Sequence, residues 1–155
     1  PYTEYQARKH TLEEYSKEIG MKLIIGGSYD LRTFITNVAD NIDGRCAYCY
    51  RVRMEETARY AAENGYDSFT TSLLISPYQN HEAIRATAQA MGEKYGVEFL
   101  YRDFRPLFQA GQEFAREHGF YMQKYCGCIF SEEDRYMAAK RKKKARQAAA
   151  QSTAQ

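Results

Sequence analysis

Hydrophobic and polar positions follow a helical period through most of this chain, interrupted by short apolar runs. Apolar residues at helical spacing, several of them followed by a glycine, predict a series of helices. These predicted helices cover residues 1–19, 31–38, 48–64, 80–95 and 106–118. A further helix is expected after the acidic first turn that begins at Ser131.

Short apolar runs rich in β-branched and aromatic residues predict strands at residues 22–25, 68–74 and 97–101. Strands that alternate with helices are typical of a parallel sheet covered on both faces. The pattern therefore predicts a three-layer α/β fold, although three strands are few for such a sheet. Open α/β sheets bind ligands beyond the carboxyl ends of their strands, so the loops after the three predicted strands are expected to line one rim.

Composition and charge divide the chain into two parts. A length of 155 residues with 44% hydrophobic content suits one domain. Residues 1–134 carry 15 basic and 20 acidic side chains, a net charge of −5, whereas the residues from Arg135 onward carry seven basic and no acidic ones. We therefore expect a single α/β domain at 1–134 and a basic, partly disordered tail at 135–155. No apolar run approaches the roughly 18 residues that span a bilayer, which predicts a cytoplasmic protein with no membrane partner.

All four cysteines lie in two closely spaced pairs, Cys46 with Cys49 and Cys126 with Cys128. In a reducing cytosol, such pairs indicate metal binding or redox chemistry more than structural disulfides. The first pair lies at a predicted helix N-terminus beside three arginines, which favours thiolates and offsets the charge of an anionic centre. Spacing alone leaves open an iron–sulfur cluster, a zinc site with four thiolates, and a redox dithiol.

Two aspartates and one tyrosine are further candidate site residues. Asp30 and Asp103 each follow a predicted strand, where a carboxylate can bind a metal or transfer a proton. Helix capping or a solvated loop position is the alternative for either aspartate. Most of the 14 tyrosines fall on apolar helix faces and are expected in the core, but Tyr125 lies next to the second cysteine pair.

With these residues laid out, the chain resembles the epoxyqueuosine reductase family of the QueH type, an iron–sulfur enzyme family. The resemblance covers residues 1 to about 131, and the order and spacing of its motifs make it specific. The matching stretches are residues 1–5 (PYTEY), 45–53 (RCAYCYRVR), 69–80 (FTTSLLISPYQN), 102–104 (RDF) and 125–130 (YCGCIF).

The resemblance implies a fold similar to the adenine-nucleotide hydrolase-like (HUP) superfamily. It implies an oxidoreductase that removes the epoxide oxygen from epoxyqueuosine at the wobble position of tRNA, the last step of queuosine biosynthesis. The implied cofactors are a [4Fe-4S] cluster and a second metal ion, iron, and the electron donor is unidentified. By motif, the metal-binding role falls on Cys46, Cys49, Cys126 and Cys128, and the carboxylate role falls on Asp103 first and Asp30 second.

An exposed wobble base must enter a pocket to be modified, so stacking and backbone contacts are expected around the implied site. The candidate substrate-binding residues are Arg51, Arg53, Tyr78 and Tyr125. The alternative function is a zinc-stapled RNA-binding or scaffolding module without redox activity.

The sequence departs from the family in one respect. Family members begin with a strand, a Cys-Cys-x-x-Cys motif, a helix and a second strand before the segment that starts here at Pro1. We therefore expect an N-terminally truncated domain, with an incomplete metal site and no activity as an isolated chain.

Overall fold

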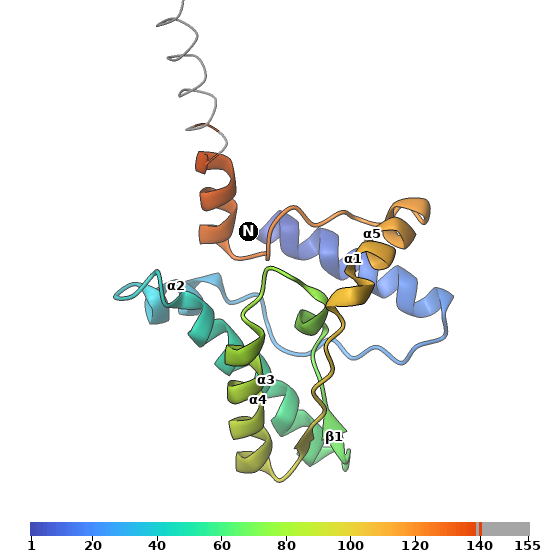
Figure 1. Cartoon of the computed structure of the whole chain (residues 1–155), viewed down its shortest axis with the longest axis vertical. Helices are drawn as coiled ribbons and strands as arrows, with labels where there is room; N and C mark the ends of the chain where they lie inside the picture. The colour runs from blue at the N-terminus through green and yellow to red at the C-terminus, as the bar shows by residue number, and fades with distance from the viewer. Residues whose placement is uncertain (139, 141–155) are drawn as a thin grey trace, which may run out of the picture. The chain divides into compact units, whose positions relative to one another are not determined.

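The computed structural model describes residues 1–138 and residue 140 (Figure 1). The chain divides into two compact units. The central unit is Asp30–Phe114, and the terminal unit combines Pro1–Tyr29 with the residues from Ala115 onward.

The central unit is mostly helical with a small parallel sheet. Its elements, in chain order, are α2 (Leu31–Val38), α3 (Arg45–Glu63), β1 (Ser68–Phe69), the 3-10 helix η1 (Ser72–Ile75), α4 (His81–Tyr95), β2 (Glu98–Phe99), the 3-10 helix η2 (Arg105–Leu107) and the first part of α5 (Phe108–Glu117). In the described residues the sheet has two strands, and β1 pairs with β2 in parallel, with Phe69 opposite Phe99. Parallel strands require a crossover connection, which α4 provides. The parallel pairing is as predicted, and the mostly helical arrangement is compatible with an α/β fold.

The core of the central unit lies between α3, α4 and the two strands. The helices α3 and α4 run side by side, and both contact the sheet (Figure 1). Met54, Leu74 and Ile84 are its largest fully buried side chains. Their burial removes apolar surface from water, the dominant favourable contribution to folding.

A glycine allows α4 to approach β2 closely. A Cβ atom at Gly92 would lie 2.5 Å from the backbone oxygen of Val97, far inside van der Waals contact. The α4 boundaries follow the local signals: the side chain of Asn80 accepts a hydrogen bond from the Ala83 amide at 3.0 Å, and Gly96 ends the helix at φ 70°.

The terminal unit is built from α1 (Tyr2–Glu18), an extended loop, the segment 120–128 and a last helix at residues 129–138. Aromatic contacts hold these parts together. The ring of Tyr15 lies 4.9 Å from that of Phe120, and the ring of Tyr2 lies 5.2 Å from that of Tyr29.

The predicted strand at residues 22–25 is wrong. These residues form neither helix nor strand, and Ile24 and Ile25 are 46% and 44% exposed. A strand requires a hydrogen-bonding partner, and this segment belongs to the terminal unit, whereas the sheet lies in the central unit. Asp30 therefore does not follow a strand.

The other two strands are shorter than predicted, and α3 begins at Arg45, three residues before the predicted start. The first strand stops because Thr71 caps η1: its hydroxyl accepts a hydrogen bond from the Leu73 amide. Of the predicted tail 135–155, residues 135–138 and 140 are helical, and the remaining positions lie outside the described residues. Among the helices described, none combines the length and apolar character needed to cross a membrane.

Candidate metal centre

The first cysteine pair lies on the opening turn of α3 in the central unit. Cys46 is exposed and Cys49 is half-buried. Residues three apart in a helix share a face, so the two thiols project from the same side of α3. The positive end of the helix dipole favours an anionic centre at this position.

The second cysteine pair also lies at a helix N-terminus, in the terminal unit. The Glu132 amide donates to the Cys128 carbonyl at 3.1 Å, which makes Cys128 the residue from which the last helix starts. Cys126 Sγ lies 3.0 Å from Ser131 Oγ, and the Ser131 hydroxyl donates to the Cys128 carbonyl at 2.7 Å. Gly127, between the two cysteines, has φ 98°, in the left-handed region that favours glycine.

The two thiols of this turn shift each other's pKa in opposite directions. A hydrogen bond from Cys128 lowers the pKa of Cys126, outweighing the effect of burial, and the Arg8 guanidinium acts in the same direction. The same hydrogen bond, together with burial, raises the pKa of Cys128. The lowered pKa of Cys126 favours its thiolate form, and thiolate sulfur suits soft or borderline metals.

The cysteine pairs thus belong to different units. No disulfide joins any of the four cysteines, all of which lie in the described part of the chain. Within either unit, the described residues contain no group of three or more His, Cys, Asp or Glu side chains placed to hold a metal ion. Each pair is therefore a separate group of two sulfur atoms within its own unit.

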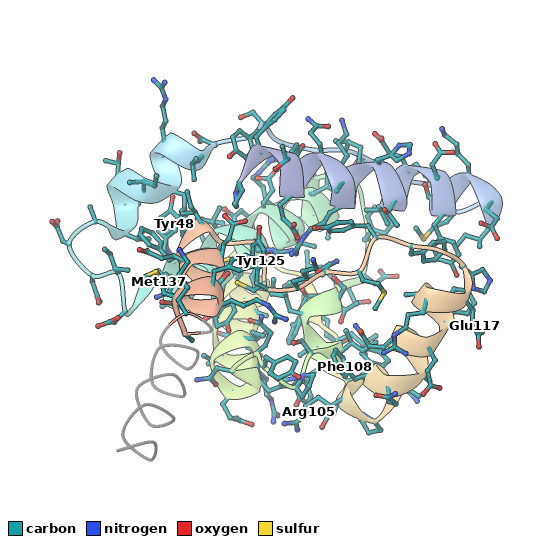
Figure 2. The ribbon with its side chains drawn as sticks, turned by 90° about the horizontal axis from the view of Figure 1, so that it is seen from above. Tyr48, Arg105, Phe108, Glu117, Tyr125 and Met137 are labelled. Atoms are coloured by element: carbon teal, nitrogen blue, oxygen red, sulfur yellow. The ribbon has the colours of Figure 1, made fainter. Side chains whose placement is uncertain are left out.

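Asp103 lies in the loop after β2, as predicted, and is held by a neighbouring arginine. Arg105 Nε donates to Oδ1 at 2.9 Å and Nη2 donates to Oδ2 at 2.6 Å, while the Arg105 amide adds a bond of 3.0 Å (Figure 2 labels Arg105). These bonds lower the pKa of Asp103 to about 2. The carboxyl group is therefore ionised at neutral pH and is not a proton donor there.

Asp30, the second candidate carboxylate, precedes α2 as its N-cap residue and makes no side-chain capping hydrogen bond.

Tyr78 is the most exposed of the large hydrophobic side chains described, at 84%. Its ring meets that of Phe108 edge to face, with centroids 5.9 Å apart (Figure 2 labels Phe108). On α3, Arg51 lies over the Tyr48 ring and pairs with Glu55 at 3.4 Å, and Arg53 is exposed. Aromatic and guanidinium groups are thus available on the surface of the central unit.

Tyr125 is anchored within the terminal unit. Its hydroxyl donates to Glu132 Oε1 at 2.7 Å, and burial together with this bond raises its pKa. The segment that carries it runs along α1, where Arg8 donates to the Tyr125 carbonyl at 2.7 Å (Figure 2).

Sequence reasoning missed the polar residues that surround the second cysteine pair: Glu4, Arg8, Tyr121 and Ser131. One signal was available, because Glu4 and Arg8 stand four residues apart at the start of a predicted helix, the spacing of a helical ion pair. Their contact with residues more than 100 positions later had no local signal.

Comparison with known proteins places the chain in a family. Residues 1–134 match the family described as Epoxyqueuosine reductase QueH. Epoxyqueuosine reductase QueH of Dehalococcoides mccartyi is 38% identical over 136 residues, covering 88% of this chain and 75% of that protein. The protein of the same name from Thermotoga maritima is 34% identical over 140 residues, covering 84% of this chain and 73% of its relative. The protein of the same name from Helicobacter pylori is 30% identical over 143 residues, covering 84% of this chain and 39% of that protein. The chain belongs to the epoxyqueuosine reductase QueH family, a family of oxidoreductases.

Proposed function

We propose that this chain provides the catalytic unit of an epoxyqueuosine reductase, which converts epoxyqueuosine to queuosine at the wobble position of tRNA. The observation that carries the proposal is the presentation of two cysteine pairs, each at a helix N-terminus, inside the region that matches the family. The reaction takes up two electrons and two protons: both C–O bonds of the epoxide break, a C=C bond forms and the oxygen leaves as water.

The donor set fits an iron–sulfur centre. Thiolates are the usual ligands of such clusters, and helix N-termini stabilise their negative charge. We assign ligand roles to Cys46, Cys49, Cys126 and Cys128. A [4Fe-4S] cluster at these cysteines would supply the electrons, and a second metal ion, iron, would polarise the epoxide oxygen.

Asp103 is the first candidate for a carboxylate in the reaction and Asp30 is the second. Because Arg105 keeps Asp103 ionised, we propose that Asp103 acts as an anionic ligand or electrostatic group, and that Arg105 must release an oxygen atom of Asp103 before it binds a metal. A carboxylate with so low a pKa is a poor proton donor at neutral pH.

For the tRNA we propose contacts by Arg51, Arg53, Tyr78 and Tyr125. Tyr78 can stack on an unpaired base, because its ring is exposed, and Arg53 can approach a phosphate. We also propose that the electron donor is a separate partner and that the reaction takes place in the cytoplasm. The fold assignment is also a proposal: parallel strands β1 and β2 joined through α4 are consistent with a three-layer sheet of the HUP superfamily.

The test is anaerobic purification followed by metal and sulfide analysis and single-turnover assay. For the genomic full-length protein we expect a brown colour, iron and acid-labile sulfide. It should convert epoxyqueuosine-tRNA to queuosine-tRNA with a chemical reductant, measured by nucleoside mass spectrometry. The Cys46→Ala and Cys126→Ala variants should lose iron and activity. A colourless protein with stoichiometric zinc, no sulfide and no turnover would instead favour the zinc-stapled RNA-binding or scaffolding module.

A further inference from the structure

The guanidinium group of Arg8 joins α1 to the backbone of the second cysteine motif. Its Nη2 donates to the Tyr125 carbonyl at 2.7 Å, and its Nη1 donates to the Cys126 carbonyl at 3.1 Å. The same guanidinium lies 5.9 Å from the centroid of the Tyr125 ring. A residue 118 positions earlier in the chain therefore holds two consecutive carbonyls at the entrance of the Cys126–Cys128 turn.

The carboxylate of Glu4 holds Arg8 in place. Arg8 Nε and Nη2 both donate to Glu4 Oε1, at 2.8 and 2.6 Å, and the Tyr121 hydroxyl donates to Oε2. Glu4 is 7% exposed, which is unusual for a carboxylate. Burying a charge is costly unless it is paired and hydrogen-bonded, so the buried Glu4 carboxylate depends on its bonds to Arg8 and Tyr121.

Gly127, at the centre of the turn, lies close to the Arg8 guanidinium group. A Cβ atom at Gly127 would lie 2.9 Å from Arg8 Nη1 and 3.1 Å from Cζ, so a larger residue at this position would displace the guanidinium group. The positive φ of Gly127 also favours glycine. Two independent constraints thus meet at the residue between the two thiols.

We infer that Glu4 and Arg8 form a clamp that sets the backbone conformation of the Cys126–Gly127–Cys128 turn and thereby the relative position of its two sulfur atoms. Both are positioning residues: they contact the backbone of the turn and each other. The inference rests on the proposed function only for the statement that these sulfur atoms bind a metal. Outer groups that orient metal ligands commonly change metal affinity by about 10- to 100-fold when they are removed.

Arginine is required for this geometry because one planar group donates in several directions at once. A lysine at position 8 keeps the charge but brings a single nitrogen, which cannot reach Glu4 and both carbonyls in the same geometry. The matched control is the half-buried pair Lys9–Glu13 on the same helix, with N and O 3.5 Å apart and side chains about one-third exposed.

The test has two readouts on metal-free protein prepared anaerobically. The first is amide hydrogen exchange at residues 125–130. The second is the affinity for Cd²⁺, titrated through the thiolate-to-metal absorption band. For Arg8→Lys and Glu4→Gln we expect exchange at these amides to rise at least about tenfold and Cd²⁺ affinity to fall by about 10- to 100-fold. Glu13→Gln should change neither quantity.

Tyr121→Phe removes only the hydrogen bond to Glu4 Oε2, so it keeps the inference testable if the other variants fail to fold. It should give a smaller increase in amide exchange and a smaller loss of Cd²⁺ affinity. Unchanged amide exchange in the folded variants would overturn the clamp. Faster exchange with unchanged Cd²⁺ affinity would overturn the positioning role. Neither readout uses the tRNA reaction, so a protein that fails as a reductase can still pass or fail this test.

Discussion

The Tyr50 hydroxyl on α3 donates to Gln79 Oε1 at 2.8 Å and accepts a hydrogen bond from the Asn80 amide at 3.3 Å. The helix that carries Cys46 and Cys49 is therefore tied to the loop that carries Tyr78, although the residues are about 30 positions apart. Tyr50 is 5% exposed, so these bonds form away from bulk water.

Replacing this hydroxyl should loosen the loop and leave the core filled. For Tyr50→Phe we expect a loss of about 1 kcal/mol in the free energy of unfolding, the usual contribution of a hydrogen bond, measured by urea titration. Amide exchange at residues 78–80 should rise. Tyr60→Phe makes the same chemical change on the same helix and should alter stability less; equal effects would argue against the tie.

The exposed ring of Tyr78 should matter for tRNA and not for stability. Base stacking on an aromatic side chain contributes about 1–3 kcal/mol, so Tyr78→Ala should weaken tRNA binding by at least about fivefold while the unfolding free energy changes by less than about 0.5 kcal/mol. Tyr78→Phe should retain affinity. Fluorescence anisotropy at fixed salt measures the binding, and full affinity in Tyr78→Ala would remove this residue from the proposed interface.

Arginines on α3 offer a matched test of phosphate contacts. Arg53→Gln should weaken tRNA binding and reduce the slope of log affinity against log salt by about one. Arg51→Gln should act in the same direction. Arg59, on the same helix, pairs with both Glu56 and Glu63 at 2.6 Å and is therefore a control: Arg59→Gln should leave the slope unchanged. Equal slopes for all three variants would contradict the placement of the tRNA.

Two isoleucines compare a buried core position with an exposed loop position. Ile84 on α4 is fully buried, and Ile84→Ala should cost about 2–5 kcal/mol of unfolding free energy. Ile24, in the segment predicted from sequence as a buried strand, is 46% exposed, and Ile24→Ala should cost about 0.5 kcal/mol or less. Thermal and urea unfolding measure both values. A large loss for Ile24→Ala would restore the buried-strand interpretation.

The buried Glu4 predicts a pH dependence. Burial raises the pKa of Glu4, but hydrogen bonds from Tyr121 and Arg8 outweigh it and lower the pKa below its ordinary value of 4.5. A carboxyl group with a lowered pKa in the folded state stabilises the protein above its unfolded-state pKa, and this contribution is lost as pH falls through the folded-state value. The Tm difference between the wild type and Glu4→Gln should therefore be constant near neutral pH and shrink below about pH 4.5. A difference that does not change with pH would show that Glu4 is not ionised.

The sequence by itself determined the features that depend on neighbouring residues. Most helix positions followed from apolar spacing, the Asn80 cap and the glycine at position 96, because a cap or a left-handed residue acts within one turn. Both cysteine motifs were recognisable from spacing, and the placement of Cys46 and Cys49 at a helix N-terminus was confirmed. The bond between Asp103 and Arg105, two positions apart, was within reach of the same local reasoning.

Only the tertiary structure decided which apolar runs become strands and what surrounds each sulfur atom. Residues 22–25 have the composition of a strand, but a strand exists only where another edge accepts its hydrogen bonds, and no local pattern encodes that partner. For the same reason, no spacing rule predicts that Arg8 contacts Cys126, because the ion pair with Glu4 is local while the bonds to the turn depend on how the terminal unit folds.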